Sequence, residues 1–406
     1  MEAAARRPVR RHDPGRRRNL SELLGRVHVS PASRSELTRV TGLNRSTIAA
    51  LVGDLMMRGL VVEDEPSAAG TIGRPSPVVR PSDRAVAIAL HPEIDAIRVA
   101  AVRLGGRVSE TVRIDVEQVP DVDRFIAIAA EAVADIRTRL PSDSVVVGAG
   151  IAVPGLVRVH DGFVRLAPHL NWRDAPLAER MQAALAMPVQ AANDASLGAA
   201  AEWTFGAGAG ADDLLYVNGG ASGIGGGIVA GGRPLVGAAG HAGEIGHVTV
   251  SPEDRVDSAG LPGTLEALVR REALAQVLGI HTADPAAFEA AVLGSQDPAV
   301  RAEVDRQVDA LAIALASVVN VLGSRRVVLG GFLGALAATA QDALTERFET
   351  RLLGPLVGEV EIRRAALGDA ILLIGAASLP FARLLDDPVA FHSPSGLSSH
   401  GSSNTL

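Results

Sequence analysis

Four consecutive polar residues, at the start of an amphipathic segment, have side chains that could read the edges of DNA bases. They are Asn44, Arg45, Ser46 and Thr47. The segment that follows places apolar side chains at positions 48, 51, 52, 55 and 56, which is the spacing of one face of a helix. The first turn of such a helix can enter the major groove, where guanidinium, amide and hydroxyl groups distinguish the base pairs. We therefore expect these four residues to contact DNA.

The residues before this helix predict a helix-turn-helix. A helix is expected over residues 19–29. Ser33 and Glu36 have the spacing of a capping box, and Gly42 is suited to the left-handed position that ends a helix. These signals place a second short helix directly before the polar residues, so that two helices are joined by a tight turn.

The residues after the helix predict a β-ribbon wing. Gly59 ends the helix, and aliphatic residues at 60–62 and 78–79 favour two strands. The tip between them would place Arg74 in the minor groove, where the negative potential attracts arginine. We therefore predict a winged helix-turn-helix over residues 19–82. A helical module that dimerises without binding DNA remains the alternative.

Basic residues gather at the N-terminus although the net charge of the chain is −7. Arginines occupy positions 6–7, 10–11 and 16–18. We expect residues 1–18 to form a disordered basic arm. Such an arm would add phosphate contacts and make DNA binding depend on salt, but the same composition also fits a solvated tail without that role.

Length and composition predict further α/β structure and exclude several kinds of site. A chain of 406 residues exceeds the roughly 250–300 at which one hydrophobic core stops growing. Hydrophobic residues make up 47% and aromatic residues 3%, so the cores must be filled mainly by aliphatic side chains. The absence of cysteine excludes disulfides, thiolate zinc sites and cysteine nucleophiles.

The sequence also favours the cytoplasm and argues against a membrane role. Apolar stretches are interrupted well before the ~18–20 uncharged residues that a membrane helix needs. The twin arginines Arg16 and Arg17 are followed by Glu22 and Arg26 where an export signal would be apolar. We therefore expect a soluble cytoplasmic protein.

Aliphatic runs beyond residue 83 predict two lobes of the ribonuclease H-like kind. The first lobe, residues 83–205, has expected strands at 85–90, 96–103, 107–114 and 145–151 and a helix at 122–139. The second lobe, residues 206–388, has expected strands at 214–217 and 327–329, a glycine-rich hairpin and long helices. A cleft between the lobes is the expected ligand site. Residues 389–406 are polar and are expected to be a disordered tail.

Several motifs in this region resemble a known family. They are VPGLV from Val153, APHLNW ending at Trp172, NDA from Asn193, and the strings GGASGIGGGIVAGGRPLVG and AGEIGHVTV. In order and spacing they resemble the ROK family of repressors, open reading frames and sugar kinases, over residues 85–385. A winged helix-turn-helix ahead of this domain is similar to the xylose and N-acetylglucosamine repressor type. The resemblance implies a two-lobed, actin-like ATPase/sugar kinase fold.

The resemblance also implies a sugar site. The residues that it places against the sugar are Asn193, Asp194, Glu244, His247 and Glu266. Carboxylates, an amide and an imidazole can satisfy the paired donors and acceptors of vicinal hydroxyls. In the kinases of the family, the residue matching Asp194 is the general base for the attacking hydroxyl.

Two departures from the family pattern argue against kinase activity and against a metal. The D-x-G-x-T phosphate loop of the kinases is replaced, because its positions hold His91, Glu93, Ile94 and Asp95. Negative charge and bulk at these positions should abolish phosphoryl transfer. The family's zinc motif, one histidine and three cysteines, is also lost, because Asp257, Ala259 and Thr264 stand at the cysteine positions. We expect no metal, and hydrogen bonds and packing should hold this loop instead.

We therefore expect a transcriptional regulator of carbohydrate metabolism, most simply a repressor. Its expected partners are operator DNA, a sugar or sugar derivative, and a second copy of the chain in a dimer or tetramer. No cofactor is expected, and the glycine-rich segment over residues 219–227 is interpreted as a tight hairpin. The alternatives are an ATP-dependent hexose kinase with an appended DNA-binding module, and a DNA-binding scaffold that responds to no ligand.

Overall fold

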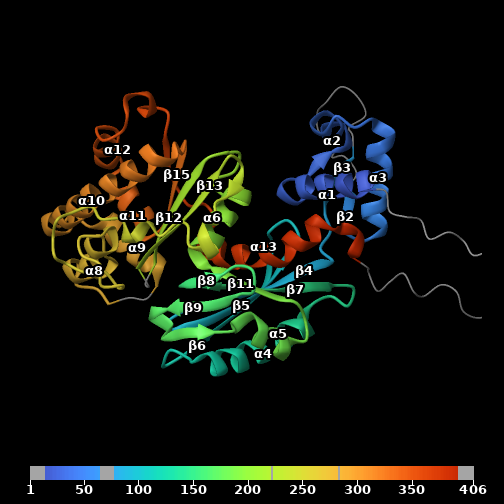
Figure 1. Cartoon of the computed structure of the whole chain (residues 1–406), viewed down its shortest axis with the longest axis horizontal. Helices are drawn as coiled ribbons and strands as arrows, with labels where there is room; N and C mark the ends of the chain where they lie inside the picture. Colours follow the sequence, from blue (N-terminus) through green and yellow to red (C-terminus); the bar gives the residue numbers. More distant parts are fainter. Residues whose placement is uncertain (1–13, 65–76, 221–222, 282–283, 392–406) are drawn as a thin grey trace, which may run out of the picture.

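The computed structural model describes residues 14–64, 77–220, 223–281 and 284–391. Arg74, at the expected wing tip, and residues 392–406 of the expected tail lie outside the described residues. Figure 1 shows three parts: an N-terminal head and two lobes.

The head, residues 14–64 and 77–81, contains the three helices and the two later strands in the order that the sequence predicts, and one short strand, β1, that it does not predict. Its elements are α1 (Pro14–Val29), β1 (Ala32–Ser33), α2 (Arg34–Thr41), α3 (Arg45–Met57), β2 (Val61–Asp64) and β3 (Val78–Pro81). The three strands form a sheet in the order β1-β3-β2. At the start of α2, the Ser33 and Glu36 side chains cap each other's backbone N–H groups, and Gly42 ends the helix with a φ of 70°.

The first helix begins earlier than expected. Pro14 opens α1, so residues 14–18 are helical and do not belong to the disordered arm that the sequence predicts. Proline suits the first position of a helix because its missing N–H has no helical partner there. The Arg16 side chain lies 3.1 Å from the Asp54 carboxylate of α3, which holds this extra turn against the rest of the head.

The first lobe is built on a five-stranded sheet in the order β11-β7-β4-β5-β6. Its strands are β4 (Ala85–Pro92), β5 (Ala96–Arg103), β6 (Val108–Asp115), β7 (Val145–Val153) and β11 (Val189–Asn193). Every residue of β4 is buried, as a central strand covered on both faces requires. The helices α4 (Val122–Arg139) and α5 (Leu177–Leu185) belong to this lobe, with a small sheet of β8 (Leu156–Arg158), β9 (Phe163–Ala167) and β10 (Trp172–Ala175).

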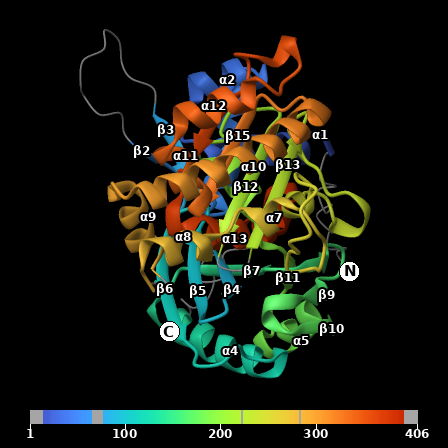
Figure 2. The ribbon, with the colours of Figure 1, turned by 90° about the vertical axis from the view of Figure 1, so that its left-hand side faces the viewer.

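The second lobe repeats the topology of the first. Its sheet order is β14-β13-β12-β15-β16, and its first strand pairs antiparallel with the second and parallel with the fourth, as in the first lobe. The strands are β12 (Leu214–Gly220), β13 (Gly223–Ala230), β14 (Arg233–Pro234), β15 (Arg326–Gly331) and β16 (Glu361–Arg364). Its helices are α7 (Leu265–Leu268), α8 (Arg271–Leu278), α9 (Pro285–Gly294), α10 (Pro298–Leu322), α11 (Phe332–Thr339) and α12 (Gln341–Glu349). Figure 2 shows these helices grouped around the second sheet.

Two helices join the three parts. The first, α6 (Asp194–Phe205), follows β11 and packs against β12 and β13 of the second lobe. The second, α13 (Ile371–Asp386), packs against α6, β4 and β7 and then reaches α1 of the head (Figure 1). The prediction placed α13 within the second lobe. Its packing on the first lobe corrects that boundary, because an apolar helix must bury its surface on the sheet that it reaches.

The segment Gly368–Asp386, which contains α13, is also apolar and long enough to cross a membrane by length and composition. In the structure its side chains Ile374, Ala377 and Phe381 are buried. One core cluster of buried residues includes Leu24 of α1, Ile48 of α3, Ala87 of β4 and Phe381 of α13. The head and the first lobe therefore share one hydrophobic core.

Candidate functional site

The junction between β11 and α6 places Asn193 and Asp194 at the opening of a helix. Asn193 caps α6, because its Oδ1 accepts from the backbone N–H of Ser196 at 2.9 Å. Its Nδ2 donates to the Gly155 carbonyl oxygen at 3.1 Å, which ties the helix to the loop after β7. Asp194 occupies the first position of α6 and accepts from the Ala195 N–H at 2.8 Å. Helix capping and loop anchoring thus fix both side chains.

Asp194 lies within the electrostatic reach of residues from both lobes. Burial raises its pKa, the His91 imidazole acts in the opposite direction, and the Glu244 carboxylate adds to the rise. These two opposing influences place His91 of β4 and Glu244 of the second lobe close to the same carboxyl group. The sequence analysis did not predict the proximity of His91 to Asp194.

Glu244 and His247 stand at the two ends of one short turn in the second lobe. The 3₁₀ segment Ile245–His247 brings the His247 Nε2 atom to 3.9 Å from a Glu244 carboxylate oxygen. Burial raises the pKa of Glu244, His247 and His241 act to lower it, and Glu266 acts to raise it. Four of the five predicted sugar-facing residues are therefore linked in one electrostatic cluster: Asp194, Glu244, His247 and Glu266. Asn193 adjoins it, because its Nδ2 donates to the Asp194 carboxylate at 3.3 Å.

Glu266 has hydrogen-bond donors on both of its carboxylate oxygens. One oxygen accepts from the Ile224 N–H at 2.8 Å, and the other accepts from the Ser258 N–H at 3.1 Å. A cavity of about 340 Å³ lies beside this side chain, and its lining also includes Asp257 and His169. In this structure Glu266 therefore holds its own loop and the β12–β13 hairpin, beside a space that could accept a ligand.

The segment that the sequence analysis aligned with the kinase phosphate loop is a closed, charge-paired turn. The His91 Nδ1 atom lies 2.9 Å from the Ala152 carbonyl oxygen, and the side chain is buried. Arg113 of β6 donates to Glu93 at 2.8 Å and to Asp95 at 3.0 Å. The prediction treated these two carboxylates as bare negative charge. Arg113, which sequence reasoning did not single out, pairs with both of them.

The loop in which the sequence analysis expected a lost zinc site is organised by hydrogen bonds. His247 Nδ1 and Thr264 Oγ1 each lie 2.8 Å from the same Asp257 oxygen. Within the described ranges, no group of three or more histidine, aspartate and glutamate side chains is placed to hold a metal ion. The sequence analysis noted Asp257 only as a lost cysteine position, whereas the structure places it at the centre of the loop.

The four predicted base-contacting residues lie together at the start of α3. Asn44 caps the helix by accepting from the Thr47 N–H and from the Ser46 hydroxyl, both at 2.8 Å. Arg45 and Ser46 are exposed, and no described residue forms an ion pair with Arg45. The free guanidinium is available to an acceptor on another molecule, while Asn44 also has a structural role.

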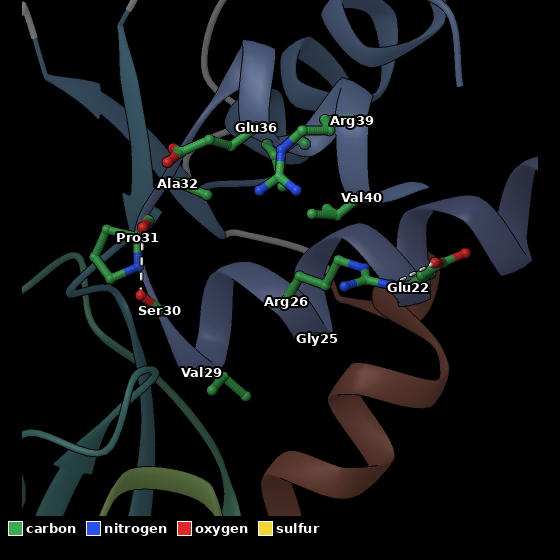
Figure 3. Close-up of a pocket in the computed structure, with 11 residues that line it drawn as sticks. Glu22, Gly25, Arg26, Val29, Ser30, Pro31, Ala32, Glu36, Arg39 and Val40 are labelled. Carbon is green, nitrogen blue, oxygen red and sulfur yellow. Dashed lines mark hydrogen bonds and ion pairs between the residues drawn. The ribbon is translucent and has the colours of Figure 1, made fainter. Parts of the chain in front are cut away.

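A second cavity, of about 590 Å³, lies between α1 and α2 of the head (Figure 3). Exposed aliphatic residues Val29 and Val40 line it together with the Glu22–Arg26 ion pair. None of the four residues at the start of α3 contributes to its lining. The groove is therefore separate from the predicted base-contacting surface.

Comparison with known proteins connects the chain to one family. The sequence pattern of the ROK family matches residues 95–382. A xylose repressor of Caldicellulosiruptor bescii is 25% identical over 374 residues, 88% of this chain and 93% of the repressor. A glucokinase of Halalkalibacterium halodurans is 32% identical over 258 residues, 59% of this chain and 77% of that enzyme.

Solved structures give the same division between regulators and kinases. A ROK family transcriptional regulator, a homologue of the E. coli MLC protein, matches with a TM-score of 0.73 at 22% identity and covers 92% of this chain and 98% of the regulator. A glucokinase from Streptomyces griseus, in complex with glucose and AMPPNP, matches with a TM-score of 0.60 at 25% identity and covers 72% of this chain and 98% of the enzyme. The xylose repressor and the MLC homologue thus match more of this chain than these two glucokinases do.

Proposed function

The chain belongs to the ROK family, and on that basis we propose that it is a DNA-binding repressor of carbohydrate metabolism whose effector is a sugar or sugar derivative. The observation that best supports a regulator is the length of its likeness to the xylose repressor, which extends over 88% of this chain. We further propose that the protein is cytoplasmic and binds operator DNA as a homodimer, with one winged helix-turn-helix on each half-site.

The sugar would bind between the lobes, against Asn193, Asp194, Glu244 and His247. These residues come from both lobes, so a ligand that contacts all of them changes the free energy of lobe closure. A sugar offers several hydroxyls, each of which can donate to a carboxylate or imidazole and accept from an amide. The proposed site requires no phosphoryl transfer.

Helix α6 offers a direct route from this site to the head. Asp194 begins the helix, and Phe205 ends it. The Phe205 ring packs edge-on against His28 of α1, with ring centroids 5.1 Å apart. His28 also packs against Phe381 of α13 and accepts from the Gly105 N–H at 2.9 Å. A shift of α6 on sugar binding would therefore reach the helix that carries the rest of the head.

The test is fluorescence anisotropy of the full chain on DNA from its own promoter region, at fixed salt. The panel is D-xylose, D-glucose, N-acetyl-D-glucosamine and their phosphates. We expect one sugar to change the DNA affinity by 5-fold or more, within the roughly 5- to 150-fold range of allosteric coupling. Specific DNA binding that no sugar alters would favour the scaffold alternative, and loss of specific DNA binding would contradict the regulator.

The second candidate is an ATP-dependent hexose kinase with an appended DNA-binding module. It is favoured by the 32% identity to a glucokinase and by Asp194 at the position of the kinase base. The replaced phosphate loop opposes it, because Ile94 and the Glu93–Arg113 pair occupy a place that needs close backbone approach to phosphates. Turnover of ATP with any of the panel's hexoses, abolished in an Asp194→Asn variant, would establish the kinase.

A further inference from the structure

The Asp257 carboxylate accepts four hydrogen bonds at a position where its side chain has no solvent exposure. One oxygen accepts from the backbone N–H groups of Ala259 and Leu261, each at 2.9 Å. The other accepts from His247 Nδ1 and from Thr264 Oγ1, each at 2.8 Å. Every acceptor position of this carboxylate is thus used by a donor from its own loop or from the sugar site.

This hydrogen-bond set fixes which nitrogen of His247 carries the hydrogen. Burial acts to raise the pKa of Asp257, but the hydrogen bonds from His247, Leu261 and Thr264 together lower it. An ionised carboxylate can only accept, so His247 must donate to it from Nδ1. In the neutral imidazole, Nε2 is then the acceptor, and this atom lies on the side of Glu244.

The same carboxylate also holds the helix that carries Glu266. Thr264 donates its hydroxyl hydrogen to Asp257, and its oxygen caps α7 by accepting from the Ala267 N–H. Glu266 follows two residues later and accepts from Ser258, the neighbour of Asp257. One buried carboxylate therefore connects His247 with the start of α7.

We propose that Asp257 is a positioning residue of the sugar site: it holds His247 as the Nδ1–H tautomer, so that Nε2 accepts a hydrogen bond from an effector hydroxyl. The proposal rests on the proposed function only for the nature of the effector. Nε2 and a Glu244 carboxyl oxygen would present two acceptors 3.9 Å apart, which suits a pair of neighbouring hydroxyl donors. Methylation or removal of those hydroxyls on the ligand should weaken binding by roughly 10- to 100-fold, as expected when buried acceptors lose their partners.

The tautomer can be measured without any ligand. Long-range ¹H–¹⁵N correlation spectra of the full chain, labelled at histidine, distinguish a protonated from an unprotonated ring nitrogen, and a His247→Gln variant assigns the signals. We expect the Nδ1–H form in the unaltered protein at neutral pH. In Asp257→Asn the new amide group would donate toward the ring, so His247 should change to the Nε2–H form.

Thr264→Val is the matched control. It removes one hydrogen bond to the same Asp257 oxygen and leaves the acceptor for His247 in place. We expect it to lower stability without changing the tautomer. An Nε2–H form in the unaltered protein, or the same tautomer in folded Asp257→Asn, would overturn the proposal. If Asp257→Asn does not fold, the unaltered protein and Thr264→Val still decide the point.

Two further measurements, sugar binding and zinc content, distinguish this proposal from the proposed function and from a metal site. If His247 shows the expected Nδ1–H form but no sugar of the panel binds, the proposed effector is wrong and the role of Asp257 still holds. Stoichiometric zinc in the purified protein, lost in His247→Gln, would overturn the proposal, because a metal and not Asp257 would then orient the ring.

Discussion

A substitution of Arg45 should affect specific and nonspecific DNA binding differently. It lies exposed in the first turn of α3, where a guanidinium can donate two hydrogen bonds to guanine. We predict that Arg45→Ala weakens binding to the specific site by about 1–3 kcal/mol and leaves binding to random DNA nearly unchanged. Anisotropy titrations on both DNAs measure this.

Arg39→Ala is the matched control for that prediction. Arg39 is an exposed arginine of the same head, but it lines the groove between α1 and α2. It should have a small effect on either DNA. Equal losses on specific and random DNA after Arg45→Ala would show that Arg45 contacts a phosphate and not a base.

His28 makes the attachment of the head sensitive to acid. Burial lowers the pKa of His28 to about 4, from the ordinary histidine value of 6.5. The unfolded chain therefore takes up a proton below pH 6.5 that the folded chain resists until about pH 4. Stability is thus fully present above pH 6.5 and is lost as the pH falls through this window, by up to about 3 kcal/mol.

Denaturant titrations at several pH values measure this loss. In His28→Gln the side chain can still accept from the Gly105 N–H but does not titrate, so the slope between pH 6.5 and 4 should become shallower. An identical slope in His28→Gln would assign the acid sensitivity to other groups.

The residue roles that sequence reasoning missed are those created by tertiary contacts. Asp257 stood at a lost cysteine position, and nothing in the order of residues indicated that four donors converge on it. Arg113 of β6 lies 18 to 20 positions from the carboxylates that it pairs with, which stand in the turn between β4 and β5. In contrast, the polar residues of α3 could be predicted because helix period and capping are local properties.

At the level of elements, α6 connects the two ends of the proposed signal. Its first residue, Asp194, belongs to the proposed sugar site, and its last, Phe205, packs against His28 of the head. We predict that Phe205→Ala leaves the sugar affinity of the free protein within about 3-fold but reduces the effect of sugar on DNA affinity. The expected loss is most of a coupling free energy of about 1–3 kcal/mol.

Calorimetry gives the sugar affinity, and anisotropy with and without the effector gives the coupling. Trp203→Phe is the control on the same helix, because Trp203 donates to the Ala211 carbonyl within the second lobe and not to the head. It should keep the coupling. Unchanged coupling in Phe205→Ala would mean that the signal passes through α13 instead.

The elements were predictable wherever their signals are local. The capping box at Ser33 and the C-terminal Gly42 placed α2 correctly, and aliphatic runs placed β4, β5, β6, β7, β12 and β15. The strands β11 and β16 were not predicted. The start of α1 was missed because its extra turn is held by the Arg16–Asp54 ion pair, which joins residues far apart in the sequence. The position of α13 was missed because an apolar helix does not specify which sheet it covers.

At the scale of the whole molecule, the head is not a separate domain on a linker, because it packs directly against the first lobe. Its core residues belong to the same buried cluster as β4 and α13, and Arg58 of the head donates to the Val389 carbonyl at 2.9 Å. The second lobe has its own cluster, which contains Leu311. Residues that share a hydrophobic core should unfold together, whereas residues in a separate core can unfold independently.

We therefore predict that the head and α13 unfold as one unit. Leu24 is fully buried in the shared cluster, so Leu24→Ala should lower the opening free energy of both α1 and α13 by about 2–5 kcal/mol. Leu311→Ala, a cavity of the same kind in the second lobe, should affect neither helix to that extent. Hydrogen exchange at increasing denaturant, read on peptides of α1 and α13, measures both. If Leu24→Ala destabilised α1 and left α13 unchanged, the head would open on its own, and a sugar signal could not reach DNA through a rigid junction between head and lobe.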